Sequence, residues 1–275
     1  MREPQPRGTA IEPNRLNDWF EDFAGYRHQV GESRITRWLG QFDDGHRDIA
    51  ARVLDCVDFV SRERIAHAFR TLLGDLPGWN INPANRQGKW RFVPFSGSAG
   101  ESGDALLYDF RLANRLDDRR YNDLFVNARD LLRQDLKAGD NVVFVDDFAG
   151  TGDHVCQAWV NDMAELLPGG PNAYLLLVAA SSAAREAISQ STNLTVARSI
   201  ELSDTDCIFS DSCVHFDVEE KTAILAYCKK ADRRLPKGYG ECGFVIVFAH
   251  RCPNNTIPIL HANHSKWVGL FRRHH

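Results

Sequence analysis

The sequence is short of the features that mark membrane, secreted and strongly basic proteins. No apolar run among its 275 residues is long enough to span a membrane, and the opening Met-Arg-Glu-Pro-Gln-Pro-Arg does not resemble a signal peptide. The seven cysteines are scattered without a Cys-x-x-Cys pair, which favours reduced thiols over a disulfide framework. The formal net charge of -4 indicates no broad nucleic-acid-binding surface. We therefore expect a cytoplasmic protein that binds neither membranes nor, over a broad surface, nucleic acid.

Three parts are predicted along the chain. Residues 1–14 contain three prolines and are predicted to be a flexible lead. Residues 15–88 show helical spacing of apolar side chains and end in a loop rich in Pro, Gly and Asn, so they are predicted to be a helical region. Residues 89–275 alternate between strand-like apolar runs and amphipathic helices, which predicts an α/β domain with a parallel sheet covered on both faces.

The helical region has two apolar stripes. One expected helix carries Ile49, Val53, Val57 and Val60, and another follows with Ser61 as its N-cap. These helices could form part of a winged-helix unit or a layer packed on the next domain. Because no basic recognition helix stands out, the sequence favours the packed layer.

One stretch joins a strand, two acids and a glycine turn. Residues 142–145 are apolar and mostly β-branched, as in a strand buried on both faces. Asp146 and Asp147 follow, then a turn with Gly150 and Gly152, and then apolar residues at every fourth position, as in an amphipathic helix. Ligands of open α/β sheets bind at the carboxyl ends of strands, and the N–H groups of such a turn can bind phosphate. The neighbouring carboxylates suit sugar hydroxyls or a metal ion.

This stretch resembles the PRPP-binding motif of type I phosphoribosyltransferases, with four apolar residues, two acids and a turn ending in Thr-Gly. The resemblance implies a Rossmann-like parallel sheet of that kind, with Asp146 and Asp147 on the ribose hydroxyls. It implies Mg²⁺ bound through substrate oxygens near this pair. The alternative is a generic strand, turn and helix of a doubly wound fold. The implied phosphate cradle consists of Phe148, Ala149, Gly150, Thr151, Gly152 and Asp153.

One residue departs from the family pattern. His154 occupies a position where the family usually has Thr or Ser. The change weakens one hydroxyl contact to the phosphate but leaves the backbone cradle in place.

A second strand, loop and helix precede the motif. Residues 90–95 are an expected strand, and a loop of small residues over 96–104 leads into a helix. Glycine and serine allow a backbone to approach a ligand closely. In phosphoribosyltransferases an early strand is followed by a loop that holds the pyrophosphate of PRPP. The resemblance thus implies pyrophosphate contacts at Ser102 and Gly103; the alternative is an ordinary surface loop.

The end of the chain makes the resemblance more specific. An expected strand over 243–248 is followed by Pro-Asn-Asn-Thr, then Ile-Pro-Ile-Leu and Trp267. This looks like the C-terminal signature of the PRTase-CE family, phosphoribosyltransferase-like proteins proposed as effectors in bacterial conflict systems, some of them encoded beside retron reverse transcriptases. The turn residues Asn254, Asn255 and Thr256 could contact a substrate or simply hold a hairpin.

A group of possible metal ligands near the C-terminus fits no standard site. His250, Cys252, His261 and His264 are close in sequence, but their spacing matches no zinc pattern. We therefore expect no metal held by these side chains.

The resemblance implies a glycosyltransferase that transfers a pentosyl group from PRPP or a related ribosyl phosphate or nucleotide. It implies a toxic effector of bacterial antiphage defence, with retrons as one setting and a reverse transcriptase complex as a protein partner. The alternative is a non-catalytic module that senses PRPP or nucleotides or binds a partner. Pyrophosphate release from PRPP would separate the two.

Overall fold

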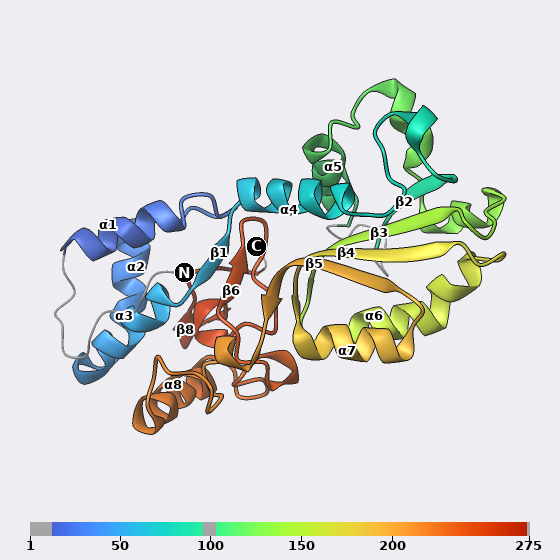
Figure 1. Ribbon diagram of the computed structural model, residues 1–275. Coiled ribbons are helices and arrows are strands. Elements are labelled where there is room, and N and C mark those ends of the chain that lie inside the picture. The colour runs from blue at the N-terminus through green and yellow to red at the C-terminus, as the bar shows by residue number, and fades with distance from the viewer. Residues whose placement is uncertain (1–12, 96–102, 274–275) are drawn as a thin grey trace. The chain divides into compact units, whose positions relative to one another are not determined.

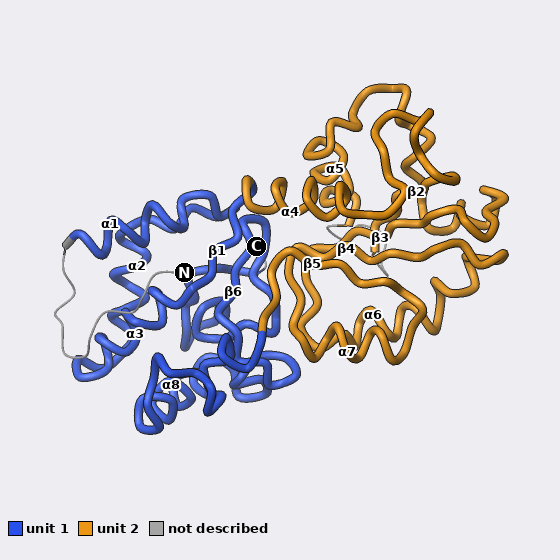
Figure 2. The backbone as a smooth tube through the Cα atoms, in the orientation of Figure 1, with its two compact units in different colours: residues 1–62, 203–275 blue, residues 63–202 orange. Residues whose placement is uncertain are grey.

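The computed structural model describes residues 13–95 and 103–273 (Figure 1). The chain falls into two compact units (Figure 2). Unit 1 contains residues 1–62 and 203–275, and unit 2 contains residues 63–202. In the sequence, unit 2 is therefore one continuous segment inserted between the two segments of unit 1. The domain division expected near residue 88 stays a prediction.

Unit 2 is built on a four-stranded sheet. Its strands are β2 (Trp90–Pro94), β3 (Asn141–Ala149), β4 (Asn172–Ser181) and β5 (Thr195–Leu202). They lie in the order β2-β3-β4-β5, and every neighbouring pair is parallel. The predicted α/β fold with a parallel sheet is thus confirmed. The buried run of β3 fits this position, since a parallel strand is covered on both faces.

Helices cover both faces of this sheet. Figure 1 shows α6 (Asp153–Ala158) and α7 (Ser182–Ser191) on one face and α4 (Arg62–Gly74) and α5 (Gly103–Ala113) on the other. Because neighbouring side chains along a strand point to opposite faces of the sheet, each strand contributes side chains to both layers of the core.

Aromatic contacts mark the two layers of the core. Phe92 of β2 meets Phe110 of α5 with ring centroids 5.1 Å apart. Phe144 of β3 meets Trp159, which follows α6, with centroids 5.8 Å apart. Phe92, Phe110 and Phe144 have no exposed surface. The sheet is therefore held between two dry layers.

The helix after the glycine turn is irregular. It continues from α6 as a π-helix over Trp159–Met163 and a 3-10 turn over Ala164–Leu166. The buried residues Val155, Trp159 and Met163 are four positions apart, which exceeds the roughly 3.6 residues of an α-helical turn. The wider π-turn keeps the later residues facing the core. The predicted amphipathic face is present, although the helix is not continuous.

Unit 1 holds α1 (Pro13–Asp22), α2 (Glu32–Leu39), α3 (Arg47–Asp55) and α8 (Val218–Ala231). Its core is rich in aromatic side chains. Trp38, for example, is buried, and its indole N–H donates to the carbonyl of Ile259.

The strands of unit 1 are short. β1 (Asp58–Val60) pairs in parallel with β6 (Ile246–Phe248), and β7 (Asn263–His264) pairs with β8 (Trp267–Val268) as an antiparallel hairpin. The strand expected over 243–248 is thus shorter than predicted. Besides Ala164–Leu166, the 3-10 turns of the described residues are Asp44–His46, Pro83–Asn85, Arg119–Leu124, Ala128–Arg133, Asp204–Asp206, Tyr239–Glu241 and Pro258–Leu260.

One helix prediction was wrong at its end. The stripe that includes Val57 and Val60 was assigned to a single helix, but α3 ends at Asp55 and Val60 belongs to β1. β-branched and aromatic residues favour a strand when a partner is available. The partner β6 lies far along the chain, so periodicity alone could not show it.

Among residues 13–95 and 103–273, no helix has both the length and the apolar character needed to cross a membrane.

Candidate functional site at the carboxyl end of β3

The acidic pair lies in the last part of β3 rather than after it. Asp146 and Asp147 are followed by Phe148 and Ala149 within the same strand. The backbone N–H of Asp147 donates to Oδ1 of Asp146 over 2.8 Å. The prediction that the pair lies at the carboxyl end of a central strand agrees with this position.

The two carboxylates differ in accessibility. Asp146 is half-buried, whereas Asp147 is only 1% exposed. Asp146 is therefore the carboxylate that a ligand reaches more readily. Asp147 is not the surface residue that its place near a strand end suggests, and we expect its removal to affect folding as well.

The turn after β3 depends on glycine at one position. Gly152 has φ of 83°, in the left-handed region that favours glycine. A Cβ atom there would lie 2.9 Å from the carbonyl oxygen of Ala184 in α7. Both the backbone angle and this close approach thus exclude a side chain. The turn is further ordered by Thr151, whose Oγ1 accepts from the backbone N–H of Asp153 over 3.3 Å.

Three consecutive N–H groups of this turn have no internal acceptor. Within the described part of the chain, the backbone N–H groups of Gly150, Thr151 and Gly152 make no hydrogen bond. Two carbonyls of the turn are used: that of Gly152 accepts from the N–H of Cys156 over 2.9 Å, and that of Gly150 accepts from a side chain described below. Since backbone N–H groups in a fold need a partner, this arrangement leaves three donors to water or to an anion.

Ser181 anchors the turn to the neighbouring strand, and the sequence argument missed it. Its side chain is 3% exposed, and its Oγ donates to the carbonyl of Gly150 over 2.6 Å. The same oxygen accepts from the N–H of Ala184 over 2.8 Å and so caps α7. The serine between a strand and a helix was a visible N-cap signal, but its bond to the glycine turn was not.

Two residues of the predicted cradle belong to the strand itself, and the cradle stays a prediction. Phe148 and Ala149 are buried members of β3 that pair with Ala179 and Ala180 of β4. Their side chains are therefore part of the core. Asp153 is exposed at the start of α6.

The predicted pyrophosphate loop is described only at its flanks. Ser102 lies outside the described residues, whereas Gly103 is buried at the start of α5. On the other flank, the N–H of Phe95 donates to the carbonyl of Val145 over 2.9 Å, next to Asp146. The ring of Phe95 also meets that of His154 with centroids 6.3 Å apart. The pyrophosphate role of Ser102 and Gly103 stays a prediction.

The Pro-Asn-Asn-Thr turn belongs to unit 1, not to the unit that holds the acidic pair. Thr256 is fully buried and donates through Oγ1 to the carbonyl of Ile246 over 2.6 Å. Asn255 is 5% exposed and donates through Nδ2 to the carbonyl of Tyr239 over 3.0 Å. Both side chains thus hold the local backbone, and of the three predicted turn residues only Asn254 is half-exposed.

No protein-held metal site is evident in residues 13–95 and 103–273, where no three His, Cys, Asp or Glu side chains are grouped as metal ligands. Burial raises the pKa of Cys252 to about 12, so its thiol is a poor metal ligand. A magnesium ion held mainly by substrate oxygens and water fits the half-buried Asp146 carboxylate better than a full protein cage.

A parallel α/β sheet with acids at a strand end and an open glycine turn fits the phosphoribosyltransferase-like class. Residues 35–273 match the family PRTase-CE. The chain belongs to the PRTase-CE family, as its sequence predicted. The match extends over parts of both units, so the family is defined by more than the sheet. No curated protein matches the chain.

Proposed function

We propose that unit 2 binds PRPP or a related ribosyl phosphate or nucleotide and transfers its pentosyl group. The observation that carries this proposal is the row of three open N–H groups at Gly150, Thr151 and Gly152, directly after the acidic pair. Such a row suits a phosphate, which accepts several hydrogen bonds at once. The membership of the PRTase-CE family supports the same function.

Each group of the donor has a partner in this arrangement. The 5′-phosphate takes the three N–H groups and the hydroxyl of Thr151. The ribose hydroxyls donate to Asp146, and to Asp147 where the ligand reaches it. Magnesium, held by the donor's phosphate oxygens with Asp146, would offset the negative charge of the departing pyrophosphate. The loop before Gly103 is the proposed site of that pyrophosphate.

The reaction breaks the bond between ribose C1 and a pyrophosphate oxygen, and the electron pair leaves with pyrophosphate. A lone pair of the acceptor forms the new bond to C1, and the acceptor then loses a proton. Because positive charge develops on the ribose, the task of the protein is to position the donor and stabilise charge. Neither task requires a covalent nucleophile.

A second candidate is a module that senses PRPP or nucleotides without turnover. The burial of Asp147 favours it, because a site with one accessible carboxylate has fewer groups to fix the ribose. Pyrophosphate release from PRPP in the presence of Mg²⁺ separates this candidate from the enzyme.

We also propose that the chain acts as a toxic effector in bacterial antiphage defence, where a reverse transcriptase complex is one fitting partner. Family membership supports this biological role. Growth inhibition by the wild type, but not by a binding-deficient variant, is the expected result in cells that express the protein.

The binding test uses Asp146→Asn against a matched control. We expect the variant to weaken PRPP binding, measured by calorimetry with Mg²⁺, by about tenfold, which corresponds to about 1.4 kcal/mol. Asp162→Asn makes the same change at an exposed position on the π-helix, and should bind like the wild type. Normal thermal melting of both variants would show that folding is intact. Wild-type affinity in Asp146→Asn would remove this residue from the site.

A further inference from the structure

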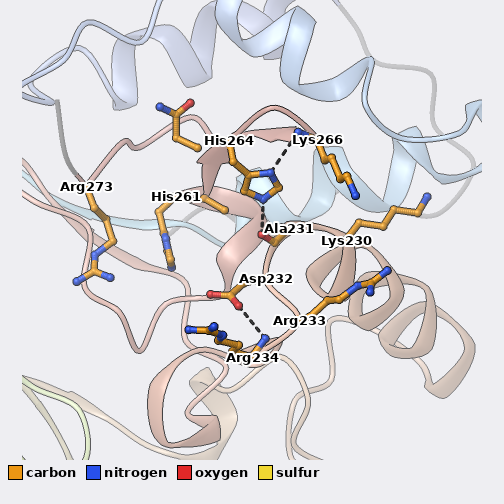
Figure 3. A pocket seen from close by; sticks show the side chains of 11 residues that line it. Lys230, Ala231, Asp232, Arg233, Arg234, His261, His264, Lys266 and Arg273 are labelled. Atoms are coloured by element: carbon orange, nitrogen blue, oxygen red, sulfur yellow. Dashed lines mark hydrogen bonds between the residues drawn. The ribbon is translucent and has the colours of Figure 1, made fainter.

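A basin in unit 1 gathers basic side chains around one carboxylate (Figure 3). It has a volume of about 650 Å³, and it is formed by the end of α8, the segment after it, the β7–β8 hairpin and the C-terminal segment. All of its lining residues belong to unit 1. Its five cations are Lys230, Arg233, Arg234, Lys266 and Arg273.

These cations lack internal counter-ions. Within the described residues, none of the five forms an ion pair. The carboxylate in the basin, that of Asp232, is occupied by the backbone: its Oδ1 accepts from the N–H groups of Arg234 over 2.8 Å and Leu235 over 3.2 Å. The acid therefore orders a turn, and one carboxylate against five cations leaves the basin with a net positive charge.

The carbonyl at the end of α8, which would repel an anion, is also occupied. The carbonyl of Ala231 accepts from Nε2 of His264 over 2.7 Å, while the N–H of Lys266 donates to Nδ1 of the same ring over 3.1 Å. A carbonyl only accepts and a backbone N–H only donates, so these partners require the neutral ring with its proton on Nε2. His264 thus covers the negative end of the helix and fixes the hairpin that presents Lys266.

Arg273 gives the basin a partly buried cation. It is half-buried, and burial, reinforced by the nearby charge of Arg251, lowers its pKa. A bound anion would offset both effects.

We infer that this basin binds the polyphosphate group of a nucleotide-sized small molecule. Arg and Lys side chains are the usual partners of phosphate oxygens. The volume lies within the range of about 300–1,000 Å³ typical of small-molecule sites. The cations are confined to one basin, and the chain as a whole has a net charge of -4. Both facts favour a small ligand over an extended nucleic-acid backbone. The site is independent of the proposed function, because it contains no residue of unit 2.

The test is calorimetric titration of the full chain with sodium triphosphate and with ATP, at low salt and without magnesium. We expect Arg234→Gln/Lys266→Gln to weaken the binding of both by about tenfold or more. The control Arg37→Gln/Lys229→Gln removes the same charge from exposed residues of unit 1 that do not line the basin, and should change the affinity about twofold at most.

Three results would overturn the inference. If the control pair weakened binding equally, the loss of affinity would come from the overall charge of the chain and not from the basin. Wild-type affinity in Arg234→Gln/Lys266→Gln would place the bound phosphates outside the basin. Binding of a single-stranded oligonucleotide that depends on Arg234 and Lys266, with no binding of triphosphate or ATP, would make the basin part of a nucleic-acid surface. Failure of PRPP to bind would leave the basin untouched, so the two proposals fail separately.

Discussion

Carboxylates, glycines and backbone N–H groups meet at both ends of β3, but their hydrogen bonding differs. At the amino end, the carboxylate of Asp140 accepts from the N–H groups of Lys89 over 2.8 Å and Lys137 over 2.9 Å. At this end the carboxylate accepts the hydrogen bonds of both N–H groups, so these donors need no outside partner. At the carboxyl end, the turn from Gly150 to Gly152 has three donors without an internal acceptor, although two acids lie just before it.

The same kinds of group thus satisfy each other's hydrogen bonds at one end of β3 and leave donors open at the other. A carboxylate that is bonded to N–H groups of its own chain fixes loops to strands. A turn whose N–H groups bond to none of the described residues leaves them open to an outside anion or to water. Residue type alone would not distinguish the two ends of β3.

The largest effect is expected from a substitution in the turn at the carboxyl end of β3. We expect Gly152→Ala to lower the free energy of unfolding by about 1–3 kcal/mol, because the residue has positive φ and its Cβ would clash with Ala184. Displaced turn N–H groups should also abolish PRPP binding. Denaturant unfolding and calorimetry measure the two effects.

The matched control for this change is Gly139→Ala near the amino end. Gly139 also has positive φ, at 93°, but its Cβ would meet nothing within 4 Å. It should therefore show the backbone cost alone and keep ligand binding. Equal losses of stability and binding in the two variants would contradict the role given to the packing of Gly152 on α7.

The next effect concerns the amino end and depends on pH. Burial acts to raise the pKa of Asp140, but the bonds from Lys89 and Lys137 and the charges of Lys89 and Arg91 outweigh it and hold the pKa below its ordinary value of 3.8. A lowered pKa in the folded state contributes stability above the unfolded pKa, and this is lost as the pH falls through the folded value.

We therefore expect Asp140→Asn to cost about 1.5–3 kcal/mol of unfolding free energy at neutral pH. The gap to the wild type should narrow as the pH falls below the ordinary carboxyl pKa. Chemical denaturation at several pH values measures it. A gap that stays constant down to about pH 2 would show that the carboxylate charge plays no part.

The smallest effect is expected from a substitution that adds a hydrogen-bond donor near the carboxyl end of β3. His154→Thr restores the hydroxyl that the phosphoribosyltransferase motif usually has at this exposed position. One added hydrogen bond is worth about 1 kcal/mol, so PRPP should bind roughly fivefold more tightly, with melting unchanged. His154→Ala is the control, since it removes the ring without adding a donor. Equal affinities of these two variants would argue that the phosphate does not reach this residue.

Local signals explain what the sequence could predict. The apolar run of β3 and the paired glycines determine the structure of residues close to them in sequence. The strand, the turn and the sheet type could therefore be predicted from the pattern. The fine structure could not: the burial of Asp147 depends on packing from other elements, and the bond from Ser181 to Gly150 joins the end of β4 to the turn after β3.

Long-range pairing explains most of the remainder. β1 is a short strand only because β6, from the other segment of unit 1, lies beside it. The basin likewise draws its cations from separate segments: the charged run over 229–234 is visible in the sequence, but its grouping with Lys266 and Arg273 is not.

The division of the chain into units also sets an order of events during synthesis. Every residue of unit 2 has been made once residue 202 is reached, so its sheet can form while the ribosome is still adding the rest. Unit 1 must wait, because β1 remains without β6 until Phe248 has emerged. In the interval, the buried residues of α1, α2 and α3 lack the later segments of unit 1 that complete their core. A chain that stalls after residue 202 would thus carry a complete unit 2 together with an unfinished, aggregation-prone unit 1.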